Sequence, residues 1–288
     1  MTMRRRKRIR PERAVLYVLL AVLVIVLVGP FIWLAMSSFK QGSQIFAPDL
    51  SFLPIDENGN ISFTFNNYTY AFDYLQVGTL FSNTFIVATV ATALNLFFNS
   101  LAGYAFARIK FKGREVLFRV VLTSLMVPGT VMLVPNMITI TKLGLYDTLP
   151  ALIVPFAMSV YNIFLMRQTF LGFPRELEEA AIIDGAGTFR VFWTIALPLA
   201  RPTLVVLGIM TFIWNYNSFL WPLVVIQSPE NDTLALGLGK LVSASATNAE
   251  LYPVMLAGAV IVAVPLIVIF LVFQRFIVKG IGAGAIKG

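Results

Sequence analysis

The chain has 288 residues, of which 58% are hydrophobic and only 12% are charged, whereas soluble domains carry about 25% charged residues. It contains neither cysteine nor histidine, which excludes disulfides and thiolate metal sites and removes the usual metal ligand and general base. The net charge of +8 would suit nucleic acid, but its distribution follows a membrane topology instead. The composition therefore predicts an integral membrane protein and weighs against an enzyme.

Six apolar stretches are long enough to cross a bilayer as helices, which takes about 20 residues each. In chain order they are Ala14–Met36, Leu80–Ala107, Val116–Val134, Pro150–Met166, Pro202–Ile226 and Pro253–Phe273. Pro128-Gly129 in the third stretch and Pro265 in the sixth are expected to kink their helices. The expected fold class is all-α, a polytopic membrane protein with six transmembrane helices.

The basic residues predict the orientation, because lysine and arginine collect in cytoplasmic loops. All but three of the 22, the exceptions being Lys40, Lys142 and Lys240, fall on one side of the six-span arrangement. Both termini are therefore expected in the cytoplasm. The predicted parts are a basic N-terminus (1–13), a first transmembrane helix (14–36), an external segment (37–79), a core of five transmembrane helices (80–273) with a cytoplasmic loop (167–201), and a cytoplasmic tail (274–288).

The cytoplasmic loop contains LEEAAIIDGAGTFRVFWTIALPLARP, a polar insert between two apolar runs. Pro174 suits the first turn of a helix over Arg175–Ile183, and Gly185 suits its end because glycine readily adopts the left-handed conformation of a helix stop. Thr188 can cap a second helix, which Pro198 then interrupts. The segment predicts a small helix–turn–helix that a partner could contact.

This insert closely resembles the coupling loop of permease subunits in ATP-binding-cassette importers, whose pattern is Glu-Ala-Ala, then Gly, then Ile-x-Leu-Pro. The residues that the resemblance assigns to coupling with the ATPase are Glu179, Ala180, Ala181, Asp184, Gly185, Ile195, Leu197 and Pro198. The likeness covers nearly the whole chain. Its other parts are LAGYAFARIKFKGR at 101–114, WNYNSFLWPL at 214–223 and RFIVKGIGAGAIKG at 275–288, which resemble the smaller permease of maltose-type systems.

The resemblance implies the type I importer permease fold in the inner membrane of a prokaryote. It also implies partners, namely a second permease subunit, two ATPase subunits and an external solute-binding protein, with no nucleic acid. ATP and Mg would belong to the ATPase subunits, and this chain would bind no cofactor and catalyse no reaction. The implied function is ATP-driven, binding-protein-dependent import of a sugar or oligosaccharide by alternating access.

Polar and aromatic side chains within the spans are candidates for a solute path, because such residues usually face a bundle interior or a cavity. They are Asn95, Asn99, Tyr161, Asn162, Asn215, Ser218 and Phe219. Asn95, Asn99 and Gly103 share one face of their helix. Amides and aromatic rings suit a sugar, yet the same side chains also hold membrane helices together, so both roles stay open.

Three alternatives remain at this stage. Within the same family, the solute could be a polyol, a glycerol phosphoester or an acidic oligosaccharide, although the spans carry no central lysine or arginine. A self-sufficient secondary transporter commonly has intramembrane carboxylates, whereas every Asp and Glu here falls in a loop or at a helix end. An intramembrane enzyme is disfavoured because the chain lacks histidine, cysteine and a mid-span acidic pair.

Overall fold

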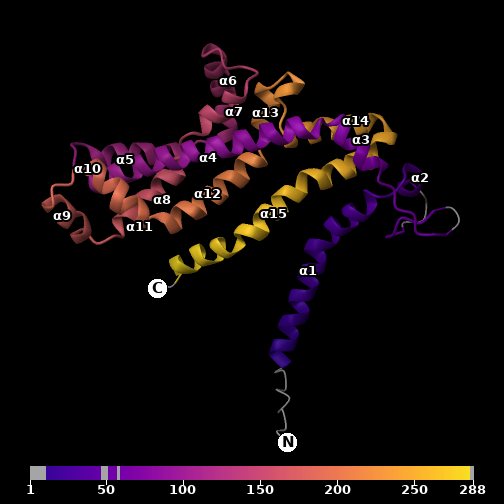
Figure 1. Ribbon diagram of the computed structural model, residues 1–288, viewed down its shortest axis with the longest axis horizontal. Helices are drawn as coiled ribbons and strands as arrows, with labels where there is room; N and C mark the ends of the chain where they lie inside the picture. Colours follow the sequence, from indigo (N-terminus) through magenta and orange to yellow (C-terminus); the bar gives the residue numbers. More distant parts are fainter. Residues whose placement is uncertain (1–10, 47–50, 57–58, 286–288) are drawn as a thin grey trace, which may run out of the picture. The chain divides into compact units, whose positions relative to one another are not determined.

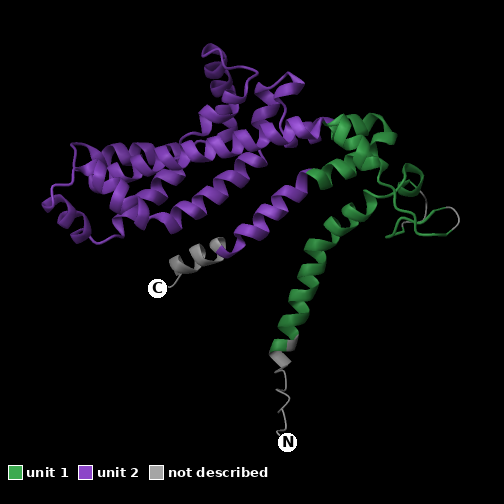
Figure 2. Ribbon diagram, in the orientation of Figure 1, with its two compact units in different colours: residues 1–75, 241–261 green, residues 76–240, 262–288 purple. Residues whose placement is uncertain are grey.

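The computed structural model describes residues 11–46, 51–56 and 59–285. Residues 1–10 of the predicted basic N-terminus and residues 286–288 of the predicted tail lie outside these ranges. Among the described residues the only β pairing is an isolated antiparallel bridge between Ile55 and Ile61, so the predicted all-α fold class is confirmed. The chain divides into two compact units, residues 1–75 with 241–261 and residues 76–240 with 262–288 (Figure 2).

The helices are named here in chain order (Figure 1). The α-helices are α1 (Pro11–Ser37), α2 (Gly42–Ile45), α3 (Asn66–Tyr74), α4 (Val77–Arg108), α5 (Arg114–Thr123), α6 (Leu133–Lys142), α7 (Leu149–Ile153), α8 (Val160–Leu171), α9 (Glu176–Ile183), α10 (Thr188–Val191), α11 (Leu197–Leu199), α12 (Arg201–Tyr216), α13 (Leu220–Val225), α14 (Leu234–Thr247) and α15 (Tyr252–Ala285). Short 3-10 helices are η1 (Ser124–Met126), η2 (Gly129–Met132), η3 (Val154–Phe156), η5 (Pro229–Asn231) and η6 (Ala249–Leu251), and η4 (Phe192–Ala196) is a π-helical turn.

The described spans are of two kinds. Three helical stretches are long and apolar enough to cross a membrane unbroken, namely Val15–Ser37, Val77–Arg108 and Ala249–Arg275. The others are pairs of helices bent at a short break, namely Arg114–Met126 with Gly129–Lys142 (94°), Leu149–Phe156 with Val160–Leu171 (44°), and Thr188–Leu199 with Arg201–Tyr216 (76°). If each bent pair is one span, the described chain has up to six.

The observed breaks correct the predicted spans in detail. The third span bends where Pro128-Gly129 predicted a kink, whereas α15 continues through Pro265. The fifth is shorter than expected, because α12 ends at Tyr216 and a separate helix, α13, begins at Leu220. The sequence analysis also did not predict α14, which lies between the fifth and sixth predicted spans.

In the first unit, the segment that follows α1 is held to the end of that helix by hydrogen bonds. Asn67 on α3 donates its amide to the carbonyl oxygens of Ser38 (2.9 Å) and Lys40 (2.8 Å). The hydroxyls of Tyr68 and Ser38 lie 2.6 Å apart. These contacts explain how α3, a short helix that the sequence did not predict, is held in place.

In the second unit, α4 packs against both α8 and α12 (Figure 1). Asn95, Asn99 and Gly103 are all buried on α4, as expected for residues that share one face of a helix. Gly103 allows the closest approach, because a Cβ there would lie 2.6 Å from Met166 Cβ and 3.0 Å from the backbone nitrogen of Arg167. Small residues commonly permit such contact between membrane helices.

Between α6 and α7, Asp147 clasps the loop that follows α13. Its Oδ1 accepts hydrogen bonds from the backbone N–H groups of Gln227 (2.9 Å) and Ser228 (3.0 Å), and its Oδ2 accepts one from the Ser228 hydroxyl. Asn231 donates to the Asp147 carbonyl oxygen at 2.7 Å. The Ser228 hydroxyl, followed by the two backbone donors, lowers the pKa of the Asp147 carboxyl to about 2.

Replacing Gly103 tests the close contact between α4 and α8. Gly103→Ala should destabilise the protein by about 1–3 kcal/mol, the usual cost of overpacking, because the added Cβ meets backbone atoms that cannot move away. Gly208→Ala is the matched control, since its Cβ would meet only Leu96 Cδ1, a side-chain end, at 3.2 Å. Thermal unfolding in detergent measures both, and equal midpoints for the two variants would contradict this packing.

The Asp147 clasp should be sensitive to acid. Because the folded pKa of about 2 lies below the ordinary value of about 3.9, its stabilisation is present above about pH 4 and is lost as the pH falls toward 2. Asp147→Asn should therefore unfold at a lower temperature than wild type at pH 7, with the gap narrowing as the pH falls. Asp73→Asn, at an exposed carboxyl, is the control, and a gap independent of pH would refute the assignment.

Candidate functional site

The first candidate site is the segment Pro174–Leu199, called here the EAA segment. Its first helix, α9, ends as predicted at a glycine in the left-handed conformation, with Gly185 at φ +83°. The N–H of Gly185 donates to the Ile182 carbonyl (3.0 Å), and the N–H of Ala186 donates to the Ala181 carbonyl (2.9 Å). This pair of bonds is the Schellman motif, which satisfies the last carbonyls of a helix.

The second half of the EAA segment, which begins at α10, is partly buried. The prediction that Thr188 caps this helix is wrong, because Gly187 occupies the cap position and Thr188 is the first helical residue, without a side-chain capping bond. Phe192 is buried, and its ring packs against those of Tyr104 on α4 and Phe170 on α8. The predicted coupling residues in this half are all half-buried, namely Ile195, Leu197 and Pro198.

The first half of the EAA segment is exposed. The predicted coupling residues Glu179, Ala180, Asp184 and Gly185 are exposed, and Ala181 is half-buried. Large apolar side chains lie near them, with Ile183 85% exposed and Phe189, at the start of the second half, 66% exposed. Exposed apolar side chains at the tip of a polar segment are typical of a protein contact surface.

Sequence reasoning missed two residues that attach the EAA segment to α4. Arg108, in the last turn of α4, has its Nε 3.0 Å from Glu178 Oε1, although the N–H does not point at that oxygen. Its Nη2 donates to the Phe173 carbonyl at 2.7 Å. Glu178 stands next to Glu179, and the resemblance assigned only Glu179 to coupling. An arginine ending an apolar helix was the available signal.

The second candidate site is a pocket of about 430 Å³ between α4, α8 and α12, called here the polar pocket. It brings together four of the seven residues predicted for a solute path, namely Asn95, Tyr161, Asn162 and Asn215. Tyr161 is exposed, whereas the three asparagines are buried. Thr211 and Trp214 complete the polar and aromatic lining.

Hydrogen bonds join the three walls of the polar pocket. The Asn162 amide on α8 donates to Asn95 Oδ1 on α4 (2.7 Å) and to Thr211 Oγ1 on α12 (3.1 Å). Asn215 donates to the Thr211 carbonyl at 2.8 Å. Sequence reasoning did not select Thr211, although it stands one helical turn before Asn215. The wall of the pocket is thus a connected network of amides and a hydroxyl.

Asn99 does not line the polar pocket, and its contacts show another role. The chain between η3 and α8 is not helical, so its backbone groups need partners from elsewhere. Asn95 donates to the Phe156 carbonyl (2.9 Å), and Asn99 Oδ1 accepts from the Ser159 N–H (3.0 Å). Asn99 also donates to Asn95 Oδ1 at 2.7 Å. The two amides therefore supply hydrogen-bond partners for the backbone groups at the break in the fourth span.

The last two predicted solute residues, Ser218 and Phe219, line an adjoining pocket of about 980 Å³. Trp214 lines both pockets, and Trp221 lines this second one. The Phe219 ring also fills a notch in α14, because a Cβ on Gly239 would lie 2.3 Å from Phe219 Cε2. Phe219 thus contributes to packing as well as to the lining.

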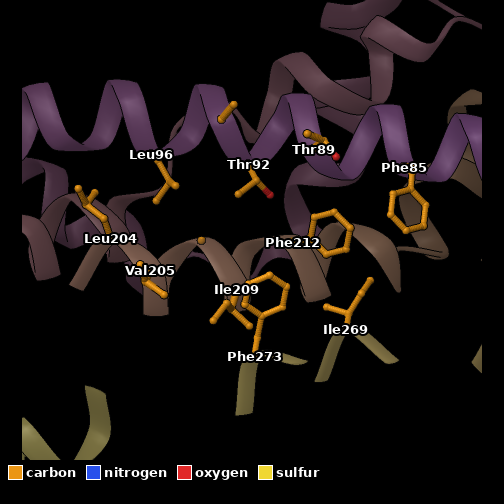
Figure 3. Close-up of a pocket in the computed structure, with 12 residues that line it drawn as sticks. Phe85, Thr89, Thr92, Leu96, Leu204, Val205, Ile209, Phe212, Ile269 and Phe273 are labelled. Carbon is orange, nitrogen blue, oxygen red and sulfur yellow. The ribbon is translucent and has the colours of Figure 1, made fainter. Parts of the chain in front are cut away.

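A third hollow, of about 610 Å³, is an apolar groove between α4, α12 and α15 (Figure 3). Its apolar lining includes Phe85, Ile209, Phe212, Ile269 and Phe273. The Thr92 hydroxyl is buried there without a hydrogen-bond partner. A groove with so few polar groups does not suit a hydroxyl-rich ligand, which leaves the two neighbouring pockets as candidate ligand sites.

The described residues contain no group of three or more acidic side chains that could hold a metal ion. None of the residues that line the polar pocket or its neighbour is charged. The chemistry that these two pockets can offer is therefore hydrogen bonding by amides and hydroxyls and contact with aromatic faces.

Comparison with known proteins gives consistent matches. Residues 99–282 match the family described as the binding-protein-dependent transport system inner membrane component. The arabinooligosaccharides transport system permease protein AraQ of Bacillus subtilis is 36% identical over 260 residues, covering 90% of each chain. The lactose transport system permease protein LacG of Rhizobium radiobacter is 32% identical over 274 residues, covering 94% of this chain and 95% of that one.

A solved structure shares the fold. One chain in the crystal structure of a bacterial ABC transporter involved in the import of the acidic polysaccharide alginate superposes with a TM-score of 0.81 at 24% identity, covering 93% of this chain and 98% of that chain. With the family match over most of the length and two relatives above 30% identity, the assignment is direct. The chain belongs to the binding-protein-dependent transport system inner membrane components, the non-catalytic, multi-pass permease subunits of ABC importers.

Proposed function

We propose that this chain is one of two permease subunits in an ATP-driven importer of neutral sugars or short oligosaccharides. The observation that carries the proposal is the similarity along nearly the whole chain to permeases named for arabino-oligosaccharides and lactose. The polar pocket supports it, because its amides can pair with sugar hydroxyls and Trp214 offers an apolar face for a sugar ring.

An acidic oligosaccharide is the second candidate, favoured by the likeness to the alginate transporter. A carboxylated solute calls for lysine or arginine in its path, and neither lines the polar pocket or its neighbour. The uncharged lining therefore favours a neutral solute over an acidic one. A partner permease that contributed basic residues would reverse this preference.

The proposed assembly contains a second permease, two ATPase subunits that hold ATP and Mg, and an external solute-binding protein. The proposed topology places the N-terminus (1–13), the loops at 108–115 and 167–201 and the tail (274–288) in the cytoplasm. Together with Arg119, these parts hold 19 of the 22 basic residues. The helix at 14–36 and the core at 80–273 span the membrane, and the segment at 37–79 lies outside. The exposed half of the EAA segment then faces the ATPase subunits.

In this mechanism the EAA segment acts as a lever. Glu179, Ala180, Ala181, Asp184 and Gly185 contact an ATPase subunit, while Ile195, Leu197 and Pro198 anchor the segment in the permease. When the ATPase subunits close on ATP, α9 moves with them, and the outward-open state becomes favoured over the resting state. Asn95, Tyr161, Asn162, Asn215, Ser218 and Phe219 line the proposed path of the solute, with Asn99 holding the adjoining backbone.

The first experiment is purification of the tagged chain from its native membrane in mild detergent, with mass spectrometry of what co-purifies. We expect a second permease and an ATPase subunit. The complex in proteoliposomes, with the binding protein encoded alongside it, should then import arabino-oligosaccharides or lactose in preference to alginate oligosaccharides. Recovery of the chain alone, active without ATP, would overturn the proposal in favour of a secondary transporter.

Gly185 provides a test of the lever. Gly185→Val places a β-branched residue at φ +83°, where a non-glycine residue costs about 1–2 kcal/mol, so the helix end should rearrange and transport should fall several-fold. Gly185→Asn is the matched control, because asparagine tolerates this conformation, and it should retain more activity. Membrane insertion, followed by the amount of folded protein, should be unchanged in both. Equal transport by the two variants would refute the need for this turn.

A further inference from the structure

We infer that Arg108 and Glu178 form a strut that makes α9 and the end of α4 move as one body when the ATPase subunits close. This inference rests on the proposed function. It adds the contact through which a displacement of the EAA segment would be transmitted to the membrane helices. Neither residue belongs to the motif that the resemblance assigned to coupling.

Both oxygens of the Glu178 carboxylate are engaged by α4. Oε1 lies 3.0 Å from Arg108 Nε, and Oε2 accepts a hydrogen bond from the Tyr104 hydroxyl at 3.4 Å. Tyr104 and Arg108 are one helical turn apart on α4, so α9 is held at two successive levels of that helix. Glu178 thus joins α9 to α4.

Arg108 also donates a hydrogen bond to the chain that leads into α9. Its Nη2 donates to the carbonyl of Phe173 at 2.7 Å, just before α9 begins. The guanidinium thus joins the connection after α8, through Phe173, to α9, through Glu178. The contact with Phe173 is a hydrogen bond, and the contact with Glu178 is an ion pair.

Burial makes this pair different from the other ion pairs of the same region. The side chains of Arg108 and Glu178 are only 6% and 13% exposed, whereas Glu115, which pairs with Arg114 and Arg167, is 52% exposed. Exposed pairs are screened by water and contribute little. A buried pair resists separation, because parting it would leave an uncompensated charge on each side.

The strut ends on the helix that lines the polar pocket. α4 is continuous from Val77 to Arg108, and the same helix carries Gly103 against α8 and Asn95 in the pocket wall. A displacement of α9 is therefore applied to α4 at Arg108 and reaches the pocket along an unbroken helix. This is a contiguous physical connection between the two candidate sites.

The test measures a distance across the strut in two states of the transporter. Because this chain has no cysteine, it takes spin labels only at the introduced Phe98→Cys on α4 and Arg175→Cys beside α9, both at exposed positions. The partner subunits are used in cysteine-free form. The distance is measured by pulsed electron resonance in the co-purified complex in nanodiscs, without nucleotide and with ATP and vanadate. With the native pair we expect the same distance in both states.

Glu178→Gln removes the charge that holds the strut. We expect a shift in the mean distance between the two states that the native pair lacks, while ATP hydrolysis by the complex continues. Glu176→Gln, at an exposed carboxyl of the same helix, is the matched control and should behave as the native pair. Arg108→Gln with Glu178→Gln leaves no lone buried charge and should fold even if the single variant does not; it should show the same shift.

A native distance that itself changes between the states would overturn the strut, and so would a folded Glu178→Gln protein whose distance stays constant. These outcomes are separate from failure of the proposed function, which would appear as the absence of an ATPase subunit in the purified complex. In that case the spin-label distance is measured in the chain purified without partners. Glu178→Gln should then broaden the distribution of that distance, and an unchanged distribution would refute the strut.

Discussion

Within hydrocarbon, every backbone donor and acceptor must find a partner inside the protein. The break in the fourth span leaves backbone groups that the helices on either side of it do not pair. The Phe156 carbonyl and the Ser159 N–H lie outside helical hydrogen bonding, and they are satisfied by Asn95 and Asn99 of α4. The break exists only while α4 lies beside it. The packing of α4 on α8, close at Gly103, is therefore a condition for the polar pocket.

One helix, α4, thus serves several purposes along its length. Toward one end it supplies Asn95 to the pocket wall and Asn99 to the broken backbone; toward the other it supplies Tyr104 and Arg108 to the EAA segment. Asn95 and Asn99 are four positions apart, as are Tyr104 and Arg108, so each pair lies on one side of the α-helix. A ligand site and a partner contact surface on the same rigid element can influence each other without any flexible connection between them.

The sequence predicted features that depend on local chemistry. The six apolar stretches, the shared face of Asn95 and Asn99, and the glycine stop at Gly185 all follow from hydropathy, helical period and backbone conformation. The gap after Tyr216 was missed, because neither proline nor glycine stands between Tyr216 and Leu220 to mark it. The inward turn of Glu178 beside the outward Glu179 could not be predicted either, since two adjacent glutamates differ only in what surrounds them.

The contact between α4 and the broken fourth span also depends on the order in which the two are synthesised. A chain is synthesised from its N-terminus, so α4 leaves the ribosome before α7 and α8 do. The amides of Asn95 and Asn99 are then already present in the bilayer when the interrupted segment arrives with unpaired backbone groups. In the opposite order, the backbone groups of the broken span would have stayed unpaired in lipid until α4 was synthesised. The order of the helices along the gene suits the order in which their hydrogen bonds are needed.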